Sequence, residues 1–177
     1  MTTQRNSQAA STAPTIPAAG ITRDRDQFLR ELVRELAIVL EDTVGLEEAE
    51  GFISTVGNRI GRMMDADYRR AMQEDELAIE QVARVLVDLK ARIEGGFEIE
   101  RITPMAIFLH NTRCPFGAYV EGRHSLCMMT SSVFGRIAAA NLGYARVVLE
   151  ETIAAGDGGC RVVVHLKEGE GGREYYS

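Results

Sequence analysis

The sequence predicts an α+β fold, in which three N-terminal helices precede a β-hairpin, a further helix and a second β-hairpin. Apolar residues recur at helical spacing up to residue 93, the periodicity changes after the paired glycines 95–96, and short valine-rich runs flank a glycine-rich turn near the C-terminus. The strand runs come in pairs and do not alternate singly with helices. We therefore expect a small antiparallel sheet packed by helices, not a parallel doubly wound sheet.

Length and composition predict one globular domain between two looser ends. The chain has 177 residues, of which 45% are hydrophobic and 26% are charged, and this is enough to bury a core. Residues 1–22 are rich in Ala, Ser, Thr, Gln and Pro, which predicts a disordered tail. We place the single α+β domain at 23–167 and a loose C-terminal tail, rich in glycine and charge, at 168–177.

Amphipathic patterns predict the three N-terminal helices. Residues 24–44, 47–72 and 74–93 each carry apolar side chains at spacings of three and four, which form one stripe on a helix. The first of these patterns ends at Gly45 and the third ends at the glycine pair 95–96. Glycine stops a helix because it tolerates backbone conformations that other residues avoid.

The second predicted helix contains glycines that need an explanation. Gly51, Gly57 and Gly61 each cost about 1 kcal/mol relative to alanine inside a helix. Glycines spaced in this way are typical of a helix that approaches another helix closely. The alternative is a ligand that lies against the bare backbone.

The rest of the chain predicts strands around one more helix. The predicted elements are strands at 97–100 and 105–109, a helix at 126–142, and strands at 145–153 and 160–166. Thr103-Pro104 suits a turn or strand start between the first two strands, and Gly143 suits a helix C-cap. The turn 156–159, Gly-Asp-Gly-Gly, is a strong hairpin signal because these residues tolerate positive φ.

The charge pattern disfavours two classes of partner. The net charge is −6, and the arginines are interleaved with acids, so no basic face is available to neutralise nucleic-acid phosphates. No apolar run approaches the roughly eighteen residues that a membrane span needs. The N-terminus has no secretory signal and the number of cysteines is odd, so we expect a reducing, cytoplasmic location with free thiols or metal ligands.

The three cysteines are the most informative side chains. Cys114 is predicted at a strand-to-loop exit, Cys127 near a helix start, and Cys160 directly after a hairpin turn. Ends of elements are where ligands for a metal or cluster can converge, and a helix N-terminus lowers the pKa of a thiol. The spacings fit no zinc-finger template, however, and buried inert thiols are the competing interpretation.

An ordered set of residues runs through the last third of the chain: Cys114-Pro115-Phe116-Gly117, Leu126-Cys127, Gly135, Leu142-Gly143, Glu151 and Gly156-Asp157-x-x-Cys160-Arg161-Val162-Val163. This set resembles the methanogen output domain, a module of bacterial and archaeal signalling proteins. More distantly it resembles the 4-vinyl reductase domain and the C-terminal half of iron–sulphur cluster assembly repressors. These groups share a frame of Cys-Pro, Cys and Gly-Asp-x-x-Cys.

The resemblance implies a small regulatory α+β fold, often dimeric, that binds a small ligand, a zinc ion or an iron–sulphur cluster. Cys114, Cys127 and Cys160 match the cysteines of the frame and are implied as its cofactor or metal ligands. Relatives often carry a further cysteine where this chain has Thr152. That departure weakens the case for a four-cysteine site.

A three-cysteine site would need a further ligand. The candidates are Glu151, His110, His124 or a group from outside the chain. Many relatives also carry a DNA-binding, kinase or receiver domain, and this sequence shows none. The resemblance therefore implies action through a signalling partner or as a homodimer.

Two alternatives to a sensing or regulatory module stay open. The first is a structural dimerisation or adaptor domain with inert buried cysteines, which the long amphipathic helices favour. The second is a cysteine-dependent hydrolase, with Cys114 and either His110 or His124 as nucleophile and base. No oxyanion loop, orienting third residue or phosphate-binding glycine motif accompanies such a pair, so we predict that the chain is not an enzyme.

Overall fold

The structure, a computed structural model, describes residues 23–177, and the tail predicted at 1–22 lies outside them. The helices are α1 (Arg25–Val44), α2 (Leu46–Met72), α3 (Ile79–Ala91) and α4 (His124–Leu142), with two short 3-10 helices, η1 (Gly117–Val120) and η2 (Ile153–Ala155). The strands are β1 (Phe97–Thr103), β2 (Ala106–Asn111), β3 (Tyr144–Glu151), β4 (Cys160–His165) and β5 (Arg173–Tyr176). The α+β fold class is confirmed.

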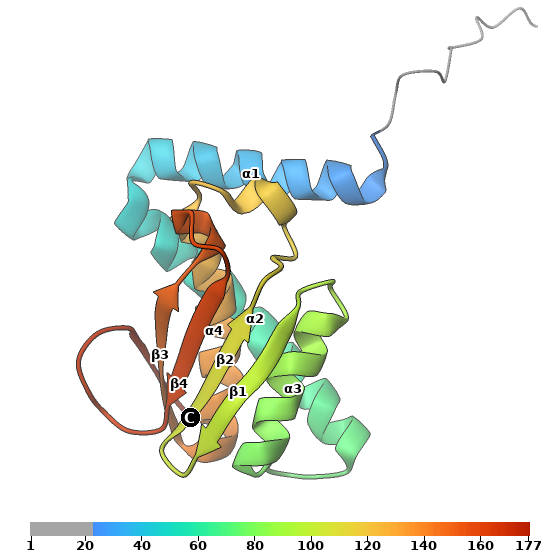
Figure 1. Cartoon of the computed structure of the whole chain (residues 1–177), viewed down its shortest axis with the longest axis vertical. Coiled ribbons are helices and arrows are strands. Elements are labelled where there is room, and N and C mark those ends of the chain that lie inside the picture. The colour runs from blue at the N-terminus through green and yellow to red at the C-terminus, as the bar shows by residue number, and fades with distance from the viewer. Residues whose placement is uncertain (1–22) are drawn as a thin grey trace, which may run out of the picture.

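The strands form one antiparallel sheet in the order β1-β2-β4-β3-β5. Helices α3 and α4 pack on one face of this sheet, and α2 packs behind α4. Helix α1 lies across one end of the domain, next to η1 (Figure 1). The second predicted hairpin therefore does not stand apart, because β4 inserts between β2 and β3 and joins both hairpins into one sheet.

The main core lies between the sheet and the two helices that cover it. Phe134 of α4 is fully buried, and its ring contacts that of Phe97 edge to face with centroids 5.4 Å apart. Alternate residues of the strands point into the same layer, as Val162 and Val164 of β4 do. Helix α4 is apolar on most sides because both the sheet and α2 bury it.

Two of the three glycines of α2 mark a close helix contact, as the sequence predicts. A side chain on Gly57 would collide with Ser132 of α4, and one on Gly61 would collide with Arg136. Gly51 has no heavy atom within 4 Å of where its side chain would begin. The interpretation therefore holds for Gly57 and Gly61, whereas Gly51 has open space beside its backbone.

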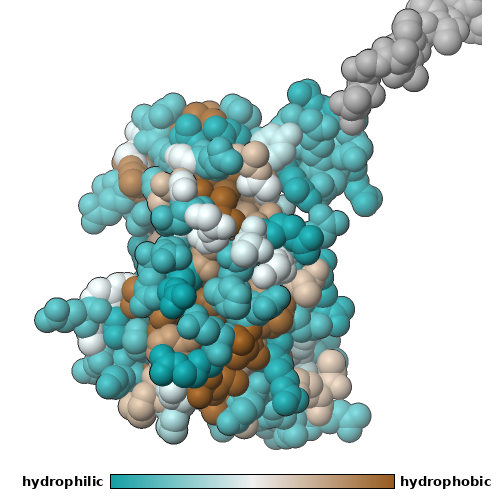
Figure 2. Space-filling view, in the orientation of Figure 1, coloured by the Kyte–Doolittle hydropathy of each residue, from teal (hydrophilic) through white to brown (hydrophobic). Residues whose placement is uncertain are grey.

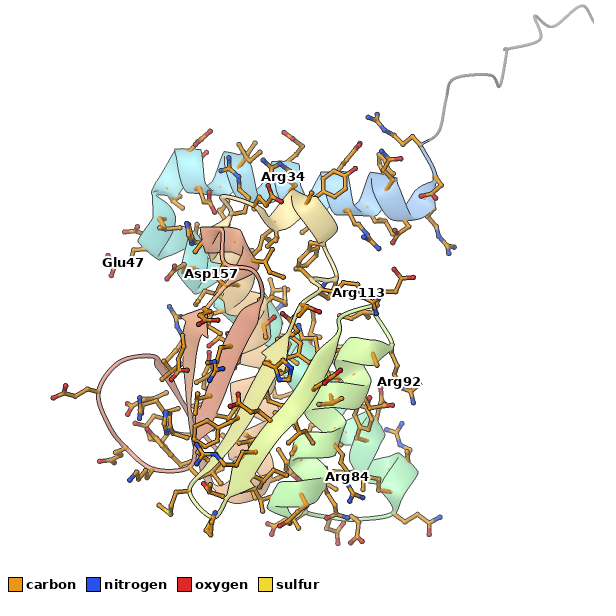
Figure 3. The ribbon with its side chains drawn as sticks, viewed as in Figure 1. Arg34, Glu47, Arg84, Arg92, Arg113 and Asp157 are labelled. Carbon is orange, nitrogen blue, oxygen red and sulfur yellow. The ribbon has the colours of Figure 1, made fainter. Side chains whose placement is uncertain are left out.

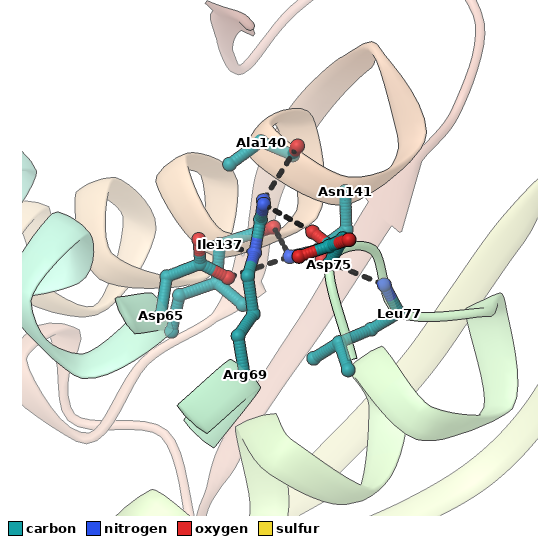
Figure 4. Close-up of polar contacts among 7 residues, drawn as sticks. All are labelled: Asp65, Arg69, Asp75, Leu77, Ile137, Ala140 and Asn141. Atoms are coloured by element: carbon teal, nitrogen blue, oxygen red, sulfur yellow. Dashed lines mark hydrogen bonds and ion pairs between the residues drawn. The ribbon is translucent and has the colours of Figure 1, made fainter. Parts of the chain in front are cut away.

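A buried polar cluster joins α2, α4 and the connection that precedes α3 (Figure 4). The Asn141 amide donates to Asp65 over 2.6 Å and to the Ile137 carbonyl over 2.8 Å, while its oxygen accepts from the Leu77 backbone N–H over 2.8 Å. Arg69 completes the cluster through an ion pair of 2.9 Å with Asp65. The cluster fixes residues 74–78 as a connection, so α3 begins at residue 79, later than its apolar pattern predicts.

The C-terminal segment differs from the prediction of a loose tail at 168–177. Residues 173–176 form β5, which pairs with β3 at the edge of the sheet. Tyr175 of β5 is buried against α4, and its hydroxyl lies 2.9 Å from that of Ser131 and 3.2 Å from that of Ser132. Gly171 and Gly172 have positive φ and allow the chain to return to the sheet before β5.

Within residues 23–177, none of the helices combines the length and the apolar character needed to cross a membrane.

Candidate functional site

The three cysteines come from separate elements and line one cavity. Cys114 follows β2, Cys127 lies in the first turns of α4, and Cys160 begins β4. The lining residues are Lys90, Phe97, Asn111, Cys114, Pro115, Phe116, Val120, Leu126, Cys127, Thr130, Leu149, Thr152, Ile153, Ala154, Cys160 and Val162. The cavity is narrow. The centres of water molecules can occupy about 30 Å³ of it, which is room for about two waters.

Strand register explains why residues so far apart in sequence meet here. Asn111 and Cys160 are opposite each other in the β2–β4 pairing, and the Asn111 side chain accepts from the Cys160 backbone N–H over 2.9 Å. Cys114 is only three residues beyond this pair. Helix α4 packs on the same face of the sheet and adds Cys127.

Burial changes the chemistry expected of the thiols. It raises the pKa of Cys114 and Cys160, and it raises the pKa of Cys127 to about 12. The expectation that a helix start lowers the pKa of Cys127 is wrong. The thiol lies in an apolar cavity, where the cost of burying a charge exceeds the attraction of the helix dipole.

The cavity also contains a buried lysine that sequence reasoning missed. Lys90 of α3 is 5% exposed, and its ammonium donates to the Thr130 hydroxyl over 2.7 Å. The ammonium also lies 5.7 Å from the ring centroid of Phe97 and 5.4 Å from that of Phe134. Burial lowers the pKa of Lys90 to about 8. A signal was present in the sequence, because Lys90 continues the buried stripe of Val82 and Leu86 at four-residue spacing.

The predicted fourth ligands lie outside the cavity. His110 and Glu151 line a neighbouring surface groove that Cys160 also borders, and the His110 ring nitrogen Nε2 is 3.8 Å from the Glu98 carboxylate. His124 is exposed at the start of α4. Thr152, which stands where relatives have a cysteine, does line the cavity.

The donor set does not fit a metal ion as it stands. Across residues 23–177, no three His, Cys, Asp or Glu side chains are grouped so that they could hold one. A closed tetrahedral zinc site needs four such donors, whereas the cavity presents three thiols and a lysine ammonium. The zinc or iron–sulphur assignment therefore stays a prediction from the resemblance.

Segment 114–123 forms part of the cavity wall and also contacts α1. Its side chains at Cys114, Phe116 and Val120 line the cavity. Arg34, labelled on α1 in Figure 3, belongs to the helix that lies next to this segment. Its guanidinium donates to the Tyr119 carbonyl over 2.6 Å and to the Glu121 carbonyl over 3.1 Å.

A second set of contacts ties α1 to the start of α4. Glu41 of α1 pairs with Arg123 at 2.8 Å and accepts from the Ser125 hydroxyl over 2.6 Å. Burial by itself raises the pKa of Glu41, but the hydrogen bonds from Ser125 and Arg123 outweigh it and lower the pKa. The carboxylate of Glu41 is therefore held in its charged form between two elements that border the cavity.

Comparisons with known proteins agree with this architecture. No curated protein matches the chain, but 22 chains of solved structures do. One is a trafficking protein particle complex subunit 3 from Naegleria fowleri, covalently bound to palmitic acid. It is 12% identical, with a TM-score of 0.62, and the match covers 80% of this chain and 97% of that chain. At this identity the likeness shows a shared fold.

The family assignment rests on a sequence match. The model of methanogen output domain 1 matches residues 32–165, which include α4, the sheet from β1 to β4 and all three cysteines. This range covers more than half of the chain and confirms the resemblance drawn from the cysteine frame. The chain therefore belongs to the methanogen output domain 1 family.

Proposed function

We propose that this chain is a non-catalytic regulatory domain that binds a small ligand in the cysteine cavity. Occupancy of the cavity would change the position of α1, which would pass the signal to a protein partner. The observation that carries the proposal is the double role of segment 114–123. Its residues line the cavity on one side and hold Arg34 of α1 on the other, so a ligand that displaces the segment also displaces α1.

The state of the thiols supports binding rather than cysteine-dependent hydrolysis. A nucleophilic cysteine needs a depressed pKa, whereas burial raises the pKa of all three thiols here. Neither His110 nor His124, the two candidate bases, lines the cavity. A mainly apolar cavity with a few polar groups is the usual form of a small-molecule site.

A covalent occupant of known size tests the coupling. Methyl methanethiosulfonate attaches a methylthio group to a thiol, and this group is large relative to a cavity that holds about two waters. We expect amide hydrogen exchange in residues 25–44 and 117–121 to accelerate at least about fivefold, which corresponds to roughly 1 kcal/mol of local stability. Mass spectrometry of peptides locates both the modification and the exchange.

The control is a variant with Ser at Cys114, Cys127 and Cys160, which should not respond to the reagent. Residues 173–176 of β5 serve as an internal reference because they do not line the cavity. Unchanged exchange in α1 after modification of a cavity thiol would contradict the proposal. Equally faster exchange in β5 would contradict it too, because it would mean general unfolding and not a local displacement.

An apolar stripe on α1 provides a surface for the output. Leu29, Leu32, Leu36 and Val39 follow the alternating spacing of three and four residues that is typical of helix pairing, and they are 42–61% exposed. Figure 2 shows exposed apolar side chains at the end of the domain that α1 forms. We propose that this stripe pairs with its equivalent in a second copy, since a twofold axis makes one stripe complementary to itself. The structurally similar trafficking protein is a subunit of a complex, which supports the use of this fold in protein assemblies.

Replacing Leu36 with lysine should disrupt such a homodimer. The charge would enter both sides of a twofold interface. Because burial of a leucine contributes about 1.5–3 kcal/mol on each side, we expect the dimer dissociation constant to rise at least about a hundredfold. Sedimentation equilibrium measures the effect. Met105→Lys is the matched control, because Met105 is 46% exposed at a turn away from α1. A wild-type protein that stays monomeric at high concentration would exclude the second copy as partner.

A further inference from the structure

Among residues 23–177, the buried ammonium of Lys90 has no acidic partner, and this bears on what the cavity binds. Its ammonium contacts the neutral Thr130 hydroxyl and lies near the faces of Phe97 and Phe134. In the part of the chain that the structure describes, no Asp or Glu side chain lines the cavity. Aromatic faces offset part of the cost of burying a cation, but a full counter-charge is absent from the lining.

A buried lysine of this kind is costly for stability. Replacing a buried charged group with an apolar side chain of similar volume is often neutral or stabilising. Methionine would have about the same length as Lys90 and would fit the apolar surroundings that Phe97 and Phe134 provide. Lys90 therefore reduces stability at a position that an apolar side chain could fill. Such a residue is expected where it has a role in binding.

We infer that the ligand is a monocarboxylate with an apolar remainder, and that Lys90 binds its carboxylate. This inference rests on the proposed function, because it names the ligand class of the same cavity. A single ammonium next to one hydroxyl suits the two oxygens of a carboxylate, whereas a phosphate group would require more donors. The rest of the lining is mostly aliphatic and aromatic, so the remainder of the ligand is apolar.

The cavity is too small for a carboxylic acid, so the ligand must enter where the wall can move. Its present volume accepts about two waters, so a carboxylic acid must displace part of the wall. Pro115, Phe116 and Val120 form the part of the wall that belongs to segment 114–123, which is a connection and not a strand of the sheet. Displacement there reaches α1 through Arg34, so entry of the carboxylate would be the event that the proposed output reports.

Octanoate and 1-octanol have the same chain length, but only octanoate carries a carboxylate. A comparison of their affinities therefore measures the contribution of the charge. Isothermal calorimetry with the wild-type protein should show octanoate binding at least about tenfold more tightly than 1-octanol, as expected for a hydrogen-bonded charge pair. Lys90→Met should abolish this preference. Without ligand, Lys90→Met should also have a higher Tm than the wild type, which a purely structural lysine would not produce.

Each outcome decides a different point. Equal binding of octanoate and 1-octanol to the wild type would overturn the carboxylate inference while the cavity remains a ligand site. Binding of neither compound would overturn the inference as well, and the methylthio experiment would then decide separately whether the cavity is coupled to α1. If Lys90→Met fails to fold, the comparison of the two compounds on the wild type still decides the role of charge. Thr130→Val gives a second variant, which should weaken octanoate binding less than Lys90→Met does.

Discussion

Replacing Asn141 with alanine should lower the free energy of unfolding by about 2.5–6 kcal/mol. Two losses add up to this figure. The Leu77 backbone N–H would be buried without an acceptor, which costs about 1–3 kcal/mol, and Asp65 would lose a charged hydrogen bond that contributes about 1.5–3 kcal/mol. Asn141 and Asp65 are 8% and 7% exposed, so water cannot readily replace the missing amide.

Urea denaturation measures this effect as a lower midpoint with an unchanged slope. The matched control is Asn58→Ala in α2, because Asn58 is only half-buried and borders a surface hollow. We expect the control to change the free energy of unfolding by less than about 0.5 kcal/mol. A loss below about 1 kcal/mol in Asn141→Ala would show that the cluster in Figure 4 does not hold the start of α3 against α4.

Gly135→Ala should destabilise the protein by about 2–4 kcal/mol, although alanine is the better helix former. The methyl group would occupy the space of the Tyr175 ring, which lies directly against the backbone of α4. The ring cannot move freely, because it is buried and its hydroxyl lies between those of Ser131 and Ser132. Displacement of Tyr175 should also weaken β5, so amide hydrogen exchange in residues 173–176 should accelerate.

Gly51→Ala is the matched control, because Gly51 is also helical but has open space at its Cβ position. This variant should be more stable than the wild type by about 1 kcal/mol. In a Tyr175→Ala background, Gly135→Ala should cost much less, since the overlap has been removed. Equal losses in both backgrounds would show that the Tyr175 ring does not explain the glycine.

Local sequence patterns were enough to predict most of the helices and strands. The predicted helices at 24–44, 47–72 and 126–142 agree with α1, α2 and α4 to within two residues at each end. Apolar periodicity is a property of neighbouring residues, so it can be read without knowing the fold. The start of α3 was missed because the apolar residues within 74–78 suit a helix. In the structure, the Leu77 N–H donates to the Asn141 side chain instead of joining a helix.

β5 was missed for a related reason. Its glycine-rich approach and four residues resemble a loose end, and the segment gains order only because β3 offers an open edge and α4 leaves space at Gly135 for Tyr175. Neither feature is visible in the segment itself. The chain order of the strands also hides the insertion of β4 between β2 and β3.

By itself the sequence determined the fold class, the family and the three cysteines as a set, because these follow from periodicity and from an ordered frame of residues. Only the tertiary structure decided that Cys114, Cys127 and Cys160 share one cavity, that burial raises their pKa values, and that Lys90 lies among them. The physical reason is that convergence and desolvation depend on strand register and helix packing between residues far apart in the chain, and local sequence patterns do not encode either.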